Sequence, residues 1–166
     1  MTRARVRWAV FAFALGIRVA AIHWNGPDVV SFGDAPDYLA TANSVCRDHL
    51  YPDRGNLPFF RAPLLPFFIA ATTFCHTERI VLIKLALASC DAVTALVIGE
   101  IAWLLFGSMA AAALGALLAA LDPLFIASVC DVRSEPLFML FLTTAIWFFL
   151  RACRDCLLYT SPSPRD

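Results

Sequence analysis

The fold of this chain is decided by its long apolar blocks, of which residues 80–106 read IVLIKLALASCDAVTALVIGEIAWLLF. A helix needs about 20 mostly apolar residues to cross the hydrocarbon core of a bilayer, and this block is long enough. Charged residues make up only 16% of the 166 residues, and the mean hydropathy is +0.72. A water-soluble domain usually carries about 25% charged residues. We therefore predict an all-α, polytopic helical membrane protein.

Four blocks are predicted to cross the membrane: residues 8–24, 80–106, about 108–121 and 136–150. The third block is short and rich in small residues, and Asp122-Pro123 breaks it. Arginines precede the first block at positions 3, 5 and 7 and follow the last block at 151 and 154. Because basic residues favour the cytoplasmic side, we expect both termini in the cytoplasm. Residues 25–79 then lie on the periplasmic, extracellular or luminal side, called the outer face below.

The first block also allows a second interpretation, a signal peptide, because Val19 and Ala21 suit a small-residue cleavage site. The apolar blocks that follow, and Arg18 late in the run, favour a span instead. Arg18 is costly in hydrocarbon. Its side chain either reaches the lipid headgroups or supplies a positive charge near the outer face, so it is a candidate substrate-binding residue.

Three charged residues interrupt the block 80–106: Lys84, Asp91 and Glu100. Lys84 and Glu100 lie near its ends, where long side chains can reach the membrane surface. Asp91 lies near the middle, and charges at that depth usually face a bundle interior or a cavity. An alternative function follows from this position, a transporter or flippase-like bundle in which Asp91 and Arg18 line a path.

The loop 25–79 is predicted to hold two interfacial helices. From Pro36, apolar residues follow helical spacing to position 50, which indicates an amphipathic helix on the membrane surface. Residues 64–74 are too few to span and suit a second interfacial or re-entrant helix. Cys46 and Cys75 share this loop, so a disulfide can form between them in an oxidising compartment; the sequence does not decide whether it does.

An acidic stretch, Gly33-Asp34-Ala35-Pro36-Asp37-Tyr38, lies where the first span ends. Asp34 precedes the predicted helix, near the positive end of its dipole, and is placed to accept a proton. Asp37 reads as a solvated acid of the first turn. The second acidic stretch, Asp131-Val132-Arg133-Ser134-Glu135-Pro136, returns to the same face if four spans are present. The plainer interpretation is that the acids cap helices and the arginines anchor them.

Other site types find little support in the sequence. The formal net charge is zero, which gives no basic field for nucleic acid. The three histidines, at positions 23, 49 and 76, share no helix face, so no metal site is predicted from them. Cys153 and Cys156 have the spacing of a redox motif but lack its strand and helix context.

Several features occur in a fixed order over residues 1–152: an arginine-flanked span, Asp34-x-x-x-Tyr38, Phe60-Arg61-Ala62-Pro63-Leu64-Leu65-Pro66, and Arg133-Ser134-Glu135-Pro136-Leu137. This set resembles the start of a GT-C glycosyltransferase. The most similar branch contains the protein O-mannosyltransferases and the aminoarabinose transferase of lipid A. The resemblance implies transfer of a sugar from a polyprenyl phosphate to an acceptor at the membrane, with inversion.

The resemblance also implies roles for individual residues. Asp34 matches the catalytic acid of the first outer loop, and Glu135 matches a second outer acid, so both are candidate catalytic residues. Arg61 matches a basic residue that contacts the lipid phosphate, and guanidinium groups suit phosphate oxygens. Tyr38 and Arg133 join Arg61 as candidate substrate-binding residues. No nucleotide cofactor is implied.

The chain departs from the family pattern at two positions. Many members carry two adjacent acids where this chain has Asp34-Ala35, and some carry glutamate at the position of Phe60. Both changes weaken a metal site, and the use of a divalent metal is left open. Residues 153–166 change composition abruptly and are expected to lie outside the transmembrane domain. The chain therefore reads as an amino-terminal piece of a transferase, expected to be inactive alone.

A third possibility, a structural membrane subunit, would be favoured by a flat, uncharged surface around Asp34.

Overall fold

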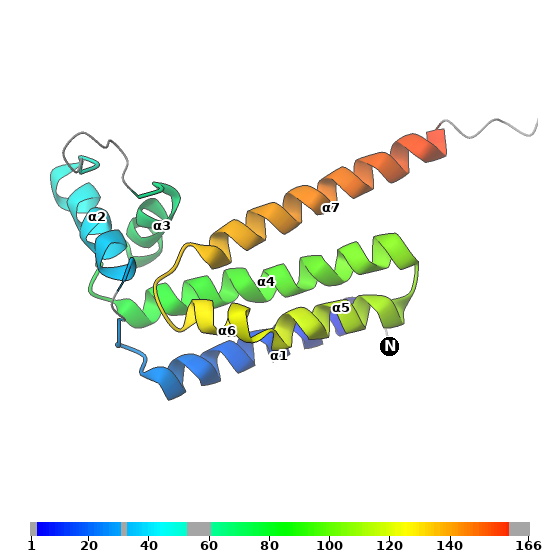
Figure 1. The fold of residues 1–166 in the computed structure, drawn as a ribbon, viewed down its shortest axis with the longest axis horizontal. Coiled ribbons are helices and arrows are strands. Elements are labelled where there is room, and N and C mark those ends of the chain that lie inside the picture. Colours follow the sequence, from blue (N-terminus) through cyan, green and yellow to red (C-terminus); the bar gives the residue numbers. More distant parts are fainter. Residues whose placement is uncertain (1–2, 31–32, 53–60, 160–166) are drawn as a thin grey trace, which may run out of the picture.

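A computed structural model describes residues 3–30, 33–52 and 61–159, and within these ranges the chain is helical, without strands (Figure 1). The helices are α1 (Arg3–Asn25), α2 (Ala35–Asp48), α3 (Leu64–Thr73), α4 (Ile80–Phe106), α5 (Met109–Leu121), α6 (Pro123–Val129) and α7 (Glu135–Tyr159). This confirms the predicted all-α, polytopic helical membrane protein.

Helix α4 is the central element, and it packs against α1, α5, α6 and α7. In Figure 1 the long helices run lengthwise beside one another, with α2 and α3 gathered at one end of the bundle. We call this the loop end. The opposite end, marked by the N-terminus, is called the terminal end.

Three helices in the described ranges, α1, α4 and α7, are long and apolar enough to cross a membrane. They contain the predicted spans 8–24, 80–106 and 136–150. Helix α5 has only 13 residues, so the predicted span 108–121 is too short alone. It is long and apolar enough to cross only if it is counted together with α6, to which it is joined at a bend of 50°. Helix α7 continues to Tyr159, beyond the change in composition at residue 153.

Small residues allow α4 and α5 to approach closely. A Cβ atom added to Gly99 would lie 2.9 Å from the Ala116 Cβ and 3.0 Å from the Ala112 carbonyl oxygen. A Cβ on Gly115 would lie 3.1 Å from the Ala102 Cβ. In lipid, such close backbone packing replaces the hydrophobic drive that holds soluble helices together.

The bend between α5 and α6 arises at Asp122-Pro123, as predicted. Asp122 is extended, with φ −61° and ψ 120°, and its Oδ1 accepts hydrogen bonds from Leu124 N at 2.8 Å and Phe125 N at 3.2 Å. These bonds cap α6. Pro123 has no N–H, and Leu124 N is already bonded to Asp122, so the carbonyls of Ala119 and Ala120 lose their helical donors.

Arg18 supplies the missing donors. Its Nη2 donates to Ala119 O at 3.3 Å, and its Nη1 donates to Ala120 O at 3.1 Å and to Ala14 O at 2.9 Å. Its Nε donates to Asp91 Oδ2, which also balances the charge. We call this group the Arg18 clamp; it ties α1 to α4 and to the end of α5.

The clamp is buried, with the Arg18 side chain 0% and the Asp91 side chain 1% exposed. Arg18 therefore does not reach the lipid headgroups, which was one of its two sequence interpretations. Lys84 is also buried, and its Nζ donates to Gly26 O at 3.2 Å and Val29 O at 2.6 Å. The expectation that Lys84 reaches the membrane surface was therefore wrong, because the loop after α1 supplies acceptors within the protein.

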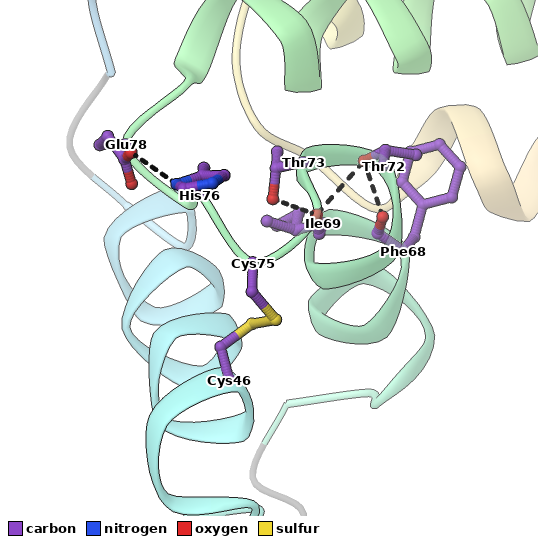
Figure 2. Close-up of a disulfide and its surroundings, with 8 residues drawn as sticks. All are labelled: Cys46, Phe68, Ile69, Thr72, Thr73, Cys75, His76 and Glu78. Atoms are coloured by element: carbon purple, nitrogen blue, oxygen red, sulfur yellow. Dashed lines mark hydrogen bonds and ion pairs between the residues drawn. A yellow bond between two sulfur atoms is a disulfide. The ribbon is translucent and has the colours of Figure 1, made fainter.

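A disulfide joins the loop-end helices, and Figure 2 shows it running from Cys46 on α2 to Cys75 just beyond α3. The two Cα atoms lie 5.5 Å apart, a usual separation for this bond. Phe74 and Cys75 turn the chain with positive φ angles of 51° and 63°, and Cys75 N donates to Ala70 O at 2.9 Å. The pairing that the sequence left open is thus formed.

Replacing Asp91 with alanine is expected to cost about 3–5 kcal/mol, because the buried Arg18 guanidinium would lose its counter-charge. The free energy of unfolding can be measured by titrating the detergent-solubilised protein with dodecyl sulfate. Glu100→Ala is the matched control on the same helix, since the Arg7–Glu100 pair is partly exposed and such pairs contribute less than about 1 kcal/mol. Equal losses in the two variants would show that the clamp does not hold the bundle.

The replacement Cys46→Ser is expected to destabilise the packing of α2 on α3 by roughly 3 kcal/mol, from the loop closure lost on opening a ring of this size. Hydrogen exchange of the α2 amides should rise, whereas the α4 amides should be unchanged. In the unaltered protein, maleimide should label Cys46 and Cys75 only after reduction. Labelling of both thiols without reductant would contradict the bond.

Candidate functional site

The loop end contains a cavity of about 270 Å³ between the start of α2 and the segment that joins α6 to α7. It is lined by Gly33, Asp34, Ala35, Tyr38, Asp131, Arg133, Ser134 and Glu135. The two acidic stretches, about 100 residues apart in the chain, therefore meet at one place. The surface around Asp34 is charged and hollowed, which argues against a purely structural subunit.

Asp34 stands at the N-cap position of α2 but its side chain makes no capping hydrogen bond. The helix is started instead by Pro36 near its first position and by the bond from Tyr38 N to Asp34 O at 3.1 Å. The carboxylate is 60% exposed, and its Oδ1 lies 2.6 Å from Arg61 Nη2. The plainer interpretation of Asp34 as a cap does not describe how this side chain is used.

Arg61 is shared between two carboxylates, because its Nη2 also lies 2.9 Å from Asp37 Oδ2. Its Cζ sits 5.7 Å from the centre of the Tyr38 ring, within the range of a cation–π contact. The hydrogen bond with Asp37 is the main cause that raises the pKa of Arg61, while partial burial acts in the opposite direction. A fixed guanidinium charge therefore lies beside the carboxylate of Asp34.

Asp37 differs from its sequence interpretation. It was expected to be a solvated acid, yet its side chain is only 23% exposed and binds Arg61. Tyr51 Oη donates to the backbone oxygen of Arg61 at 2.5 Å, which fixes the chain where Arg61 starts the approach to α3. No local pattern reveals the Asp37 contact, because its partner comes from a different segment.

Arg133 lies between the acids of the second stretch. Its Nε is 3.9 Å from Asp131 Oδ2 and its Nη1 is 3.9 Å from Glu135 Oε1. These distances are long for ion pairs, and the Arg133 side chain is 53% exposed, so the two contacts are weak. Arg133 is therefore available to an anion in the cavity.

Tyr38 links the two halves of the site. Its hydroxyl lies 3.5 Å from Ser134 Oγ, at the limit of a hydrogen bond, and its ring is buried. Ser134 was not among the predicted site residues, and Asp131 was expected on this face only as part of the second acidic stretch. Asp131 is 8% exposed on its side chain, and its Oδ1 accepts from Val132 N at 2.8 Å, which shapes the turn before Arg133.

Arg18 is not brought to this cavity. All of its described contacts are those of the Arg18 clamp, inside the helix bundle. Its predicted role as a substrate-binding residue therefore receives no support from its position. Asp91 likewise sits in a buried ion pair, so its position does not support the transporter alternative.

A second cavity of about 440 Å³ adjoins the first and shares Asp131 and Arg133 with it. It lies between the end of α1 and α6, where its remaining lining is Asn25, Val29, Leu121, Pro123, Ile126, Ala127 and Cys130. Its wall is more apolar than that of the first cavity, so the two together present a charged chamber beside a partly apolar one.

Among residues 3–30, 33–52 and 61–159, no group of three histidine, cysteine or acidic side chains is close enough to hold a metal ion. Phe60, one of the two departures from the family pattern, lies outside the described residues.

Residues 60–159 match the sequence model of a family described as dolichyl-phosphate-mannose-protein mannosyltransferase. The match covers more than half of the chain. The chain belongs to this family. It is accordingly a glycosyltransferase of the mannosyltransferase kind, and the GT-C resemblance of the sequence is confirmed. No curated protein and no solved structure matches the chain.

The match to the mannosyltransferase family covers only part of the candidate site. Arg61, Arg133 and Glu135 fall inside the matched residues, whereas Asp34 and Tyr38 precede them. The match also runs to residue 159, the end of α7. The structure therefore adds Asp34 to the site, because it places the start of α2 beside the matched segment.

The meeting of the two acidic stretches can be tested by photocrosslinking. A p-benzoyl-phenylalanine introduced at position 38 is expected to form an adduct with residues 131–135, since the Tyr38 hydroxyl lies beside Ser134. Peptide mass spectrometry identifies the adduct. The same probe at Leu50, which is 68% exposed beyond the far end of α2, serves as the control and should give none. Adducts of 131–135 from position 50 alone would contradict the site.

Proposed function

We propose that this mannosyltransferase-family chain transfers a sugar from a polyprenyl phosphate to an acceptor, with inversion, in the cavity at the loop end. The observation that carries the proposal is the ion pair of 2.6 Å between Asp34 and Arg61. Asp34 lines the cavity together with Arg133 and Glu135, and Arg61 lines a neighbouring cavity of about 190 Å³. The ion pair sets a proton acceptor beside a phosphate-binding group.

The two arginines suit the phosphate of the donor. Guanidinium groups bind phosphate oxygens through paired, charge-assisted hydrogen bonds. Arg133 is held only by contacts of 3.9 Å, so an incoming phosphate meets little competition there. At Arg61 the phosphate competes with Asp34, and exchange of one anion for the other releases the Asp34 carboxylate for chemistry.

In the proposed reaction the acceptor displaces the phosphate from the sugar in one step. Asp34 takes the proton of the acceptor hydroxyl or amine. The acceptor atom forms a bond to C1 of the sugar on the face opposite the phosphate, and the bond between C1 and the phosphate oxygen breaks. The phosphate keeps the electron pair, and the arginines stabilise its charge. A single displacement of this kind inverts the configuration at C1.

Glu135 and Tyr38 bind the reacting molecules in this scheme. Glu135 is 55% exposed on its side chain and lines the same cavity as Asp34, where it accepts hydrogen bonds from sugar or acceptor hydroxyls. Tyr38 presents its hydroxyl next to Ser134. The adjoining cavity between α1 and α6 is suited by its more apolar wall to the first part of the polyprenyl chain.

The loop end is proposed to face the periplasm, the exterior or a lumen. The Cys46–Cys75 bond supports this orientation, because disulfides persist in oxidising compartments. The arginines at positions 5, 7, 151 and 154 belong to the opposite end of α1 and α7, as expected for a cytoplasmic side. The donor and the surrounding lipid are then the partners of the site.

Replacing Asp34 with asparagine is expected to lower the transfer rate by at least about 10²-fold, because the amide cannot take the acceptor proton. Transfer of radiolabelled mannose from dolichyl phosphate mannose is measured in membranes from cells that express the protein. Asp48→Asn, on the same helix and exposed, is the matched control and should retain activity.

The variant Asp37→Asn distinguishes the roles of the two carboxylates that Arg61 binds. Its loss should be much smaller than that of Asp34→Asn, because Asp37 orients Arg61 and takes no proton. Membrane insertion of every variant is checked by its resistance to alkaline extraction. An inserted Asp34→Asn variant with full activity would remove Asp34 from the mechanism.

A further inference from the structure

The terminal end of the bundle holds a second basic site, independent of the proposed transfer reaction. Helices α1, α4 and α7 converge there on a cavity of about 300 Å³. Its lining is Arg7, Glu100, Trp103, Leu104, Trp147, Arg151 and Arg154. Three arginines and one glutamate give this cavity a formal net charge of +2.

The single acid is already engaged by one of the arginines. Arg7 Nε donates to Glu100 Oε1 at 2.8 Å, and Arg7 Nη2 lies 2.7 Å from Glu100 Oε2. The fork of the Arg7 guanidinium thus grips both carboxylate oxygens, the favoured geometry of such a pair. The positive charge of the cavity is therefore concentrated on Arg151 and Arg154.

Those two arginines are held over tryptophan rings. The Arg151 Cζ lies 5.3 Å from the ring centre of Trp147, and the Arg154 Cζ lies 5.4 Å from that of Trp103. Both distances fit a cation–π contact, which places the guanidinium without using its N–H groups. In the described part of the chain neither arginine forms an ion pair with a carboxylate, and both are exposed.

We propose that this cavity binds the phosphate headgroup of an anionic phospholipid. A pair of pre-oriented guanidinium groups is suited to phosphate oxygens. Tryptophans prefer the headgroup level of a bilayer, which places Trp103 and Trp147 where such a phosphate lies. Basic pockets between transmembrane helices are known sites for anionic headgroups. The cavity volume suits a headgroup, with the acyl chains left outside in the bilayer.

The test compares phosphatidylglycerol with phosphatidylcholine, which has no net charge. The protein is purified in a neutral detergent, each lipid is titrated in, and bound lipid is counted by native mass spectrometry. Unaltered protein should bind phosphatidylglycerol more tightly than phosphatidylcholine. Arg151→Gln/Arg154→Gln should lower the phosphatidylglycerol affinity roughly tenfold or more, since each basic residue near a lipid surface adds to binding.

A matched control removes the same charge from the other end. Arg47→Gln/Arg79→Gln changes two exposed arginines at the loop end and should leave the phosphatidylglycerol affinity unchanged. Glu100→Gln removes the acid of the cavity and should raise the affinity severalfold, a gain that a damaged fold would not produce. Circular dichroism checks the helix content of each variant.

Other outcomes overturn the proposal. Equal phosphatidylglycerol affinities for the two double variants would show that the cavity does not bind the lipid. Inorganic phosphate that binds unaltered protein more tightly than phosphatidylglycerol does, and that loses this binding in Arg151→Gln/Arg154→Gln, would assign the cavity to a soluble phosphate compound instead. Equal binding of the two lipids by unaltered protein would also refute it.

Discussion

The Arg18 clamp is the interaction on which the rest of the structure depends. A helix that breaks inside a membrane exposes carbonyl oxygens to a solvent that has no hydrogen-bond donors, at a cost of several kcal/mol for each. The break at Asp122-Pro123 creates such carbonyls on Ala119 and Ala120, and Arg18 satisfies both. Asp91 then balances the charge that Arg18 brings. Each of these costly groups is stable only because the others are present.

The broken helix matters to the site because α6 leads directly to the second acidic stretch. A straight continuation of α5 would carry residues 131–135 along the axis of that helix. The bend of 50° redirects them toward α2. The other half of the site is held from the opposite side, where Arg61 binds Asp34 and Asp37 and the disulfide ties α2 to the end of α3. The cavity therefore forms between two segments that are fixed separately.

Composition predicted the spans well because the apolar length of a block does not depend on the rest of the chain. The break at Asp122-Pro123 was predictable too, because a proline interrupts a helix wherever it stands. The contacts of Arg18 depend on a partner elsewhere in the chain. Depth offered a clue, since Arg18 and Asp91 lie roughly 10 and 16 Å from the loop-end termini of α1 and α4. Opposite charges at similar depth favour pairing over separate functions. Asp37 and Lys84 gave no such clue, because their partners lie in irregular segments whose position the sequence does not reveal.

The disulfide holds α2 covalently near the end of the helix that lies away from Asp34. Cys46 is eleven residues from Ala35, where the helix begins, so the covalent anchor acts roughly 17 Å along the axis from the carboxylate end. The other end of α2, next to Asp34, is held by ion pairs and by the packing of Tyr38. A rotation of a few degrees about the anchor moves that end by about an ångström, a displacement comparable to the tolerance of catalytic geometry. The Cys46–Cys75 bond thus limits how far α2 can turn, and with it how far Asp34 can move.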